Sequence, residues 1–405
     1  MSKASFIPFI TGQQACDLAS EFFGDAPMVR VPLEKVETLD DYLPPVRRWV
    51  DAGVDGLDNL AKSTPKKKDA KDKKAKPDPR QPWYDRISSF EGFEEIADPA
   101  FQASPKKGVV ADFVAAALDA CVQHKATAVS VPQLPHVDGS ERNKINKVMA
   151  AAAAGWQVEH PKVTLILPVI LNHPKHSSSK TQRNSHVKLA AQCLAASKAQ
   201  GCWIVDASLN DEEQSATLRR DRLAGMIKFH EEFNAATANA TFTRIAGPYW
   251  ALNLLLWSRG LVDRVGIGAG TGFRYHLAGG FPSKGTARIA IPPLYRRAKT
   301  GVELKNWITD ALKAIEPTHP FSEPLTKLKP LAAPSQEAAR RQTATFYRGW
   351  IDMLAATPAP GRAMALFQAL SIAFSYGKQI QAKLDAEGTT RRPESIAEAL
   401  MLNCL

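Results

Sequence analysis

Val163-Thr-Leu-Ile-Leu-Pro-Val-Ile170 is the stretch that decides the fold of this 405-residue chain. It is an apolar run of strand length, and the helical stretch Thr181–Gln200 that follows it ends at Gly201, a residue typical of helix ends. A second apolar run, Cys202-Trp-Ile-Val-Asp206, comes next. A strand, a helix and a strand in this order are typical of two parallel strands joined by a crossover helix.

The same alternation extends in both directions from this stretch. Runs read as strands begin at Phe6, Met28, Val54, Thr127, Val163, Cys202, Thr243 and Arg264. Eight parallel strands, nearly all separated by helices, predict a (β/α)8 barrel of the TIM type, and an open, doubly wound parallel sheet is the alternative. In this scheme Asp40–Ala52 leads into a third strand at Val54–Asp58, and Ala287–Ile291 is a further strand beside the eighth one or at one end of the barrel.

The sequence also predicts how the chain is divided. Residues 1–316 form the barrel, interrupted at about residues 62–80 by an insertion with too few apolar side chains to fold, which is expected to be disordered. A Pro-rich connector occupies residues 317–334, and residues 335–405 form a helical extension. The helices of this extension are expected at Ser335–Ala356, Arg362–Leu384 and Pro393–Leu402, packed on the barrel or on another protein.

Composition and charge limit the classes of function. Apolar residues make up 44% of the chain and charged residues 23%, which is typical of a globular protein. The net charge is +11, but Ala61–Arg80 alone holds nine Lys and Arg against three Asp, so the remainder is only mildly basic. The five widely spaced cysteines indicate reduced thiols, and the sequence has no Cys-x-x-Cys pair. Without a signal peptide or a long apolar stretch, a cytoplasmic protein with no membrane contact is expected.

Barrel enzymes act at the carboxyl ends of their strands, so candidate catalytic residues are sought there. Asp58 and Asp206 each end an apolar run, where a carboxylate needs a partner, a ligand or solvent. Each is a candidate general base, and the alternative for each is a helix cap or an ion pair. His173 follows the Val163–Ile170 run and is a third candidate. Its spacing to His176 would suit a metal only on a helix, and the intervening proline favours a loop, so no metal site is predicted.

The strongest candidate for ligand binding is the Gly-rich stretch from Gly247 to Gly285. By the strand count it forms the loops after the seventh and eighth strands, which in this fold commonly bind a phosphate through backbone N–H groups. A basic helix start at Arg142 would face the same end of the barrel. The predicted anion-binding residues are Gly247, Tyr249, Gly268, Gly270, Gly272, Arg274, His276, Lys284 and Arg142. Alternating glycines also suit a bulge or close packing in a crowded barrel, and this alternative stays open.

Three functions are compatible with these features. The first is an enzyme, a hydrolase or transferase, that acts on a phosphate-bearing small molecule or a nucleotide with a carboxylate as general base. The second is a non-catalytic subunit of a nucleic-acid-handling or defence-type assembly, in which the Lys-rich insertion binds nucleic acid and the C-terminal helices bind another protein. The third is two-aspartate glycosidic or base-exchange chemistry on nucleic acid. The sequence identifies no cofactor.

Overall fold

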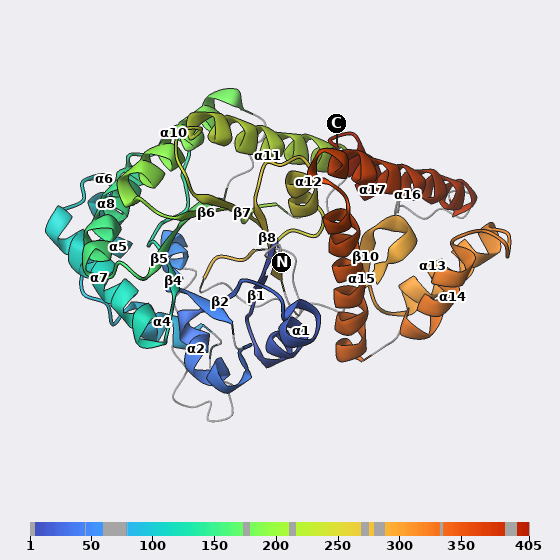
Figure 1. Ribbon diagram of the computed structural model, residues 1–405, viewed down its shortest axis with the longest axis horizontal. Coiled ribbons are helices and arrows are strands. Elements are labelled where there is room, and N and C mark those ends of the chain that lie inside the picture. The colour runs from blue at the N-terminus through green and yellow to red at the C-terminus, as the bar shows by residue number, and fades with distance from the viewer. Residues whose placement is uncertain are drawn as a thin grey trace, which may run out of the picture.

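The computed structural model of the protein describes residues 5–44, 46–59, 78, 80–172, 179–209, 216–268, 275–278, 288–332, 335–384 and 395–404. Within these ranges, eight parallel strands close into a barrel in the order of the chain, with β1 paired to β8 (Figure 1). The strands are β1 (Phe6–Phe9), β2 (Met28–Pro32), β3 (Arg47–Asp51), β4 (Ala128–Ser130), β5 (Thr164–Leu171), β6 (Gly201–Asp206), β7 (Thr243–Ala246) and β8 (Arg264–Gly268). This closed barrel confirms the predicted (β/α)8 fold and excludes the open sheet.

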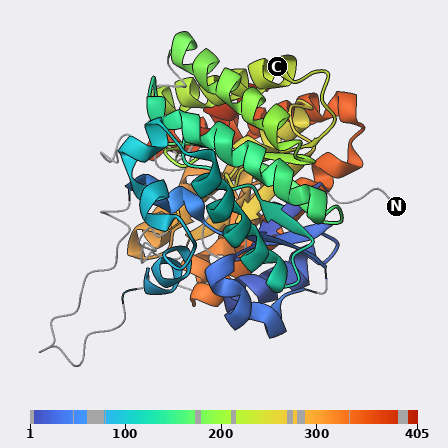
Figure 2. The same ribbon diagram turned by 90° about the vertical axis from the view of Figure 1, so that its left-hand side faces the viewer.

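A ring of helices surrounds the barrel, because strands buried on both faces need an apolar cover on the outside. The helices that follow the first seven strands are α1 (Gln13–Phe23), α2 (Leu33–Leu39), α7 (Lys107–Gln123), α8 (Lys144–Glu159), α10 (Lys180–Ser197), α11 (Ala216–Ala236) and α12 (Leu252–Ser258). Shorter helices between β3 and α7 are η2 (Val54–Asn59), α4 (Gln81–Ile87), α5 (Phe93–Ala97) and α6 (Pro99–Ala103). On one outer side α7, α8 and α10 pack next to one another, where Figure 2 shows them in teal to green.

The eighth place in this ring is taken by α15 (Gln336–Ala356), from the C-terminal part of the chain. It packs against α1, and Figure 1 shows it between α1 and α12. The hydroxyl of its buried Tyr347 donates to Oδ1 of Asn253 in α12 at 2.9 Å. Asn253 in turn donates from Nδ2 to the carbonyl of Gly266 in β8 at 2.8 Å. The helical extension therefore contributes directly to the wall of the barrel.

A second, smaller core lies beside α15, whereas the buried residues of the last helix, α17 (Ser395–Met401), belong to the main core. The second core is formed by β9 (Arg288–Ile291), β10 (Arg296–Lys299), α13 (Val302–Ala314), α14 (Ser322–Leu328) and part of α16 (Arg362–Leu384). This core joins Ile291, Leu304, Leu325 and Ile380, and α17 packs back onto α11. Within the described ranges, no helix combines the length and the hydropathy that a membrane crossing requires.

Two strands differ from the sequence-based prediction. The third strand is Arg47–Asp51 rather than Val54–Asp58, which is the 3-10 helix η2. The sequence pattern did not reveal this strand, because its first two residues, Arg47 and Arg48, are polar. They lie at the amino-terminal rim of the barrel, where Arg48 pairs with Asp40. The strand expected at Ala287–Ile291 is β9, which pairs antiparallel with β10 in a separate sheet and takes no part in the barrel.

Candidate active site at the carboxyl-terminal mouth of the barrel

Aromatic rings surround one arginine in the barrel interior near the carboxyl ends of the strands. Strand pairing places Phe9 of β1, Arg30 of β2 and Trp49 of β3 side by side, with their side chains on the same face. The guanidinium carbon of Arg30 lies 4.8 Å from the ring centroid of Phe9 and 4.7 Å from that of Trp203 in β6. The rings of Phe9, Trp49 and Trp203 meet edge to face. Such cation–π contacts favour a guanidinium group that is removed from water.

Asp51, at the carboxyl end of β3, compensates the charge of Arg30. Nη2 of Arg30 and Oδ2 of Asp51 form an ion pair whose side chains are only 6% and 8% exposed. The backbone N–H of Gly53 also donates to Oδ1 of Asp51 at 3.1 Å, which holds the start of the turn into η2. Because an uncompensated buried charge is costly, this pair ties β2 to β3 at the mouth of the barrel.

A second carboxyl group, Asp55 of η2, lies at the same mouth. Its Oδ2 accepts hydrogen bonds from the hydroxyl of Tyr275 at 2.9 Å and from the backbone N–H of Ala278 at 3.1 Å. The pKa of Asp55 is raised from 3.8 to about 7, first by burial and then by the charge of Asp51, against the two hydrogen bonds and Arg30.

The partner hydroxyl is held in its protonated form. Burial and the neighbouring Asp55 raise the pKa of Tyr275 well above its ordinary value, so that Tyr275 remains a hydrogen-bond donor at neutral pH. A carboxyl group that titrates near neutral pH beside a fixed donor is suited to take up or give a proton. This arrangement is the candidate active site.

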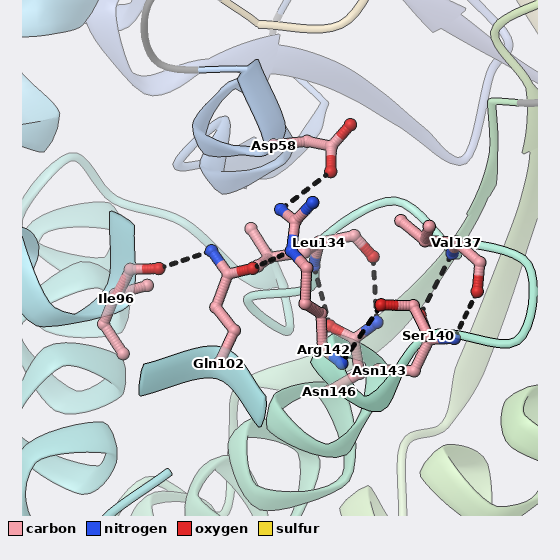
Figure 3. Close-up of polar contacts among 9 residues, drawn as sticks. All are labelled: Asp58, Ile96, Gln102, Leu134, Val137, Ser140, Arg142, Asn143 and Asn146. Atoms are coloured by element: carbon pink, nitrogen blue, oxygen red, sulfur yellow. Dashed lines mark hydrogen bonds and ion pairs between the residues drawn. The ribbon is translucent and has the colours of Figure 1, made fainter. Parts of the chain in front are cut away.

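The predicted catalytic residue Asp58 and the predicted anion-binding residue Arg142 form an ion pair (Figure 3). Arg142 donates from Nη2 to Oδ1 of Asp58 at 3.3 Å, and from Nε to Oε1 of Gln102 in α6 at 2.6 Å. Gln102 donates in turn to the carbonyl of Ile96 at 2.8 Å. Burial raises the pKa of Asp58, and Arg142 opposes that shift. The structure thus joins two residues that the sequence analysis had assigned to separate roles.

Two asparagines fix the loop that carries Arg142. Oδ1 of Asn143 accepts from the backbone N–H of Val137 at 3.0 Å, and Oδ1 of Asn146 accepts from the backbone N–H of Leu134 at 2.8 Å. Figure 3 shows both side chains turned back toward the loop after β4, while Arg142 extends toward η2. The orientation of Arg142 is therefore set by side chains on its own loop and helix as well as by its ion-pair partner.

Asp206, the other predicted catalytic carboxylate, faces away from the barrel interior. Because Trp203 of the same strand faces inward, alternation turns Asp206 toward the surrounding helices. Its Oδ1 accepts from the backbone N–H of Ser208 at 2.8 Å and from the Ser208 hydroxyl at 2.6 Å, and Nη2 of Arg222 lies 3.9 Å from its Oδ2. The backbone N–H of Asp206 donates to the hydroxyl of Tyr249, and both residues are fully buried. In this arrangement Asp206 and Tyr249 order the loops after β6 and β7.

The predicted anion-binding glycines are described only in part. Gly247 has a φ of +90°, and a Cβ there would lie 2.9 Å from the backbone nitrogen of Tyr249 and 3.2 Å from the carbonyl oxygen of Gly266, so close packing requires glycine at this position. Gly268 ends β8 and is half-buried, and His276 is exposed. The predicted site residues that lie outside the described ranges are His173, Gly270, Gly272, Arg274 and Lys284.

A buried histidine pair lies near the ends of β4 and β5 and was not predicted. Nε2 of His186 in α10 is hydrogen-bonded to Oδ1 of Asp138, and the ring of His136 stacks on His186 with centroids 5.6 Å apart. Among the residues that the structure describes, no group of three or more His, Cys, Asp and Glu is arranged to hold a metal ion. The hydrogen bond from His186 and its stacking with His136 join the loop after β4 to α10.

Three residues of the candidate site, Arg30, Asp51 and Asp55, were missed by the sequence analysis. Arg30 carries a visible signal, since it is the only charged residue in the apolar run Met28–Leu33 and so needs a buried partner. Asp51 was overlooked because the third strand was placed at Val54–Asp58, which moved the expected strand end to Asp58. Tyr275 lies inside the predicted Gly-rich stretch but was not among its predicted site residues, because its role depends on contact with Asp55, 220 positions away.

Comparisons with protein-family models, with curated proteins and with solved structures find no match for this chain.

Proposed function

We propose that this protein is an enzyme that uses Asp55 as a general acid or base on a small phosphate-bearing molecule at the carboxyl-terminal mouth of its barrel. The observation that carries this proposal is the hydrogen bond of 2.9 Å from the Tyr275 hydroxyl to Oδ2 of Asp55, a buried carboxyl group whose pKa is raised to about 7. Near neutral pH such a group is populated in both protonation states, which favours proton transfer in either direction.

The neighbours of Asp55 have distinct parts in this proposal. Tyr275 and Ala278 both donate to Oδ2, so we assign the proton exchange to Oδ1. The same two donors stabilise the carboxylate once it has lost its proton. Arg30 pairs with Asp51 and so prevents the mouth from holding two uncompensated negative charges.

Position and composition support a phosphate-bearing substrate. The loops after β7 and β8 belong to the Gly-rich stretch, and loops at these places commonly bind phosphate in barrels of this kind. The exposed His276 adjoins Tyr275, and Arg274 and Lys284 add positive charge to the same stretch of sequence. Basic side chains and backbone N–H groups are the donors that recognise phosphate oxygens.

Replacement of Asp55 by Asn tests the catalytic part of the proposal. On a panel of sugar phosphates and nucleotides, D55N should lower kcat by about 10²- to 10⁴-fold with a much smaller effect on KM, because the proton donor and acceptor is lost. Asp112→Asn, on the exposed face of α7, is the matched control and should leave both constants unchanged. A D55N variant with an unaltered kcat would show that the reaction does not use this carboxyl group.

The phosphate part is tested separately by Gly270→Phe. A bulky side chain at this position should abolish the binding of inorganic phosphate and nucleotides, measured by titration calorimetry, while circular dichroism shows that the fold persists. Gly349→Phe in α15 is the control, because a Cβ at Gly349 meets no atom within 4 Å. Equal binding by the wild type and G270F would contradict a phosphate site in this loop.

Glycosidic chemistry with two aspartates is a second candidate. The observation that favours it is that Asp51 raises the pKa of Asp55, as expected for two carboxyl groups in one site. Chromatography of the products from nucleotides and single-stranded nucleic acid separates the two candidates. Release of a free base supports glycosidic cleavage or exchange, whereas turnover of a phosphate-bearing substrate with any base still attached supports the first proposal.

A further inference from the structure

Residues 275–278 lie over the carboxyl-terminal mouth of the barrel. The ring of Tyr275 packs edge to face on Trp203 of β6, with centroids 4.9 Å apart, and its centroid lies 5.5 Å from the guanidinium carbon of Arg30. Three residues later, Ala278 lies against η2, which directly follows β3. The ring of Trp203 points into the barrel interior, where its centroid lies 5.5 Å from that of Trp49 of β3, so this short segment lies over the interior beside η2.

The segment packs closely against η2 and Trp83, at a place that we call its seat. A Cβ at Gly56 would lie 2.3 Å from the carbonyl oxygen of Ala278 and 2.4 Å from Cζ2 of Trp83, so only glycine allows this approach. Trp83 donates from Nε1 to the carbonyl of Gly53 at 2.9 Å and thereby forms a fixed wall of the seat. Asp55 then holds the segment by accepting both the Tyr275 hydroxyl and the Ala278 N–H.

The seated segment covers the charged pair inside the barrel. The Arg30 and Asp51 side chains are only 6% and 8% exposed, and Tyr275 above them is itself 6% exposed. A buried guanidinium surrounded by aromatic side chains, and the buried carboxylate paired with it, cannot meet a ligand in this arrangement. Access to them requires Tyr275 to move, because the rings of Trp203 in β6 and Trp49 in β3 belong to strands of the barrel and are fully buried.

We infer that residues 275–278 form a strap that closes the mouth of the barrel and leaves its seat on η2 to admit a ligand to Arg30 and Asp51. The hydrogen bonds from Tyr275 and Ala278 to one carboxylate oxygen join the strap to η2, whereas a continuous hydrogen-bond ladder joins β6 beneath it to β5. Local opening is therefore expected to be far more frequent than unfolding of the barrel. The class of ligand rests on the proposed function, but the movement of the strap does not.

Hydrogen–deuterium exchange on the full chain, followed by mass spectrometry, tests the strap without a substrate. In the wild type, the amides of residues 275–278 should exchange at least about tenfold faster than those of β6, through a local opening. Tyr275→Phe removes one of the two hydrogen bonds to Asp55 and should accelerate the exchange of this segment about tenfold further, with no change in β6. Tyr42→Phe, at an exposed tyrosine, is the matched control and should have no effect.

A second variant acts on the seat rather than on the hydrogen bonds. Gly56→Ala places a methyl group where the carbonyl of Ala278 lies, so it should accelerate exchange in residues 275–278 and leave β6 unchanged. Gly108→Ala in α7, where a Cβ meets no atom within 4 Å, should change neither segment.

Two results would overturn the strap. One is wild-type exchange in residues 275–278 as slow as in β6, which would make the segment a permanent part of the barrel. The other is acceleration by G56A and Y275F that is equal in β6 and in the segment, which would mean that both variants act through global unfolding. Since no substrate is present, either result leaves the proposed function to be judged by the D55N kinetics alone.

Discussion

Two carboxyl groups at the mouth of the barrel differ in their partners, and the difference governs what each can do. Asp51 faces a guanidinium group and forms a compensated ion pair. Asp55 faces a hydroxyl and a backbone N–H, which stabilise its charge only in part, so burial raises its pKa to about 7. Asp51 thus has a fixed charge partner in Arg30, whereas a group poised between two protonation states, such as Asp55, suits proton transfer.

The raised pKa of Asp55 predicts how stability depends on pH. Its pKa is about 7 in the folded protein against 3.8 without the fold, so the folded state binds the proton more tightly. The stabilisation is fully present below the unfolded pKa and is lost as pH rises through about 7. Between pH 5 and 8 the free energy of unfolding of the wild type should fall by about 2–3 kcal/mol relative to that of D55N.

Urea denaturation of the two proteins at several pH values measures this difference. Asp112→Asn serves again as the control, because its exposed carboxyl group should give the same pH profile as the wild type. Parallel pH profiles for D55N and the wild type would mean that the pKa of Asp55 is not raised in the folded protein.

Arg30 allows a test of the buried ion pair. Arg30→Met leaves Asp51 buried without its guanidinium partner and should lower the free energy of unfolding by about 3–5 kcal/mol. The double variant R30M/D51N removes both charges and should be more stable than R30M alone, as measured by urea denaturation. A double variant less stable than R30M would show that Asp51 is not destabilised by the loss of Arg30.

At the scale of elements, the barrel is closed by a helix that is distant in the sequence. Tyr347 of α15 reaches Asn253 of α12, and Asn253 reaches the backbone of β8 at Gly266. A Cβ at Gly266 would lie 2.9 Å from Cε1 of Phe9, so the missing side chain makes room for the aromatic ring beneath the mouth. The wall of the barrel and its filled interior thus depend on the same short segment of β8.

Tyr347→Phe tests this link between elements. Loss of the hydroxyl leaves Oδ1 of Asn253 with one donor fewer in a fully buried place and should cost about 1–2 kcal/mol of unfolding free energy, measured by thermal or urea denaturation. Tyr42→Phe, at a tyrosine that is 46% exposed, should cost nothing measurable. Equal effects of the two substitutions would argue against a hydrogen bond that supports the barrel wall.

At the scale of the whole molecule, the barrel and the C-terminal helices are expected to form one cooperative unit. Residues 1–332 alone lack α15, which packs on α1 and completes the ring, so this fragment should show no cooperative unfolding transition by calorimetry. Deletion of Lys66–Lys76 is the contrasting change, because that stretch is nearly free of apolar side chains and its loss should leave the transition in place. A fragment that unfolds cooperatively would mean that the barrel is stable without the helix.

The accuracy of the sequence analysis followed the apolar content of each element. The strands Thr243–Ala246 and Arg264–Gly268 lie where the sequence predicted them. After their first polar residues, both strands contain only apolar residues and glycine, as expected for strands that are buried on both faces. The third strand was displaced because residues 40–52 were read as a helix that leads through Gly53 into a strand, and a displaced strand moves its end as well. Attention therefore went to Asp58, whereas Asp51 ends the strand.

The sequence by itself determined the alternation of strands and helices, because hydrophobic periodicity is a local property of each segment. The sequence predicted a closed barrel with an open sheet as the alternative, and only the pairing of β1 with β8 decided between them. It also placed the Gly-rich stretch from Gly247 to Gly285 in the last two loops. Only the tertiary structure decided that Arg30, Asp51, Asp55 and Tyr275 meet at one mouth, and that α15 closes the ring. These contacts join segments far apart in the chain, and their ion pairing and pKa shifts arise from burial among neighbours that no local pattern specifies.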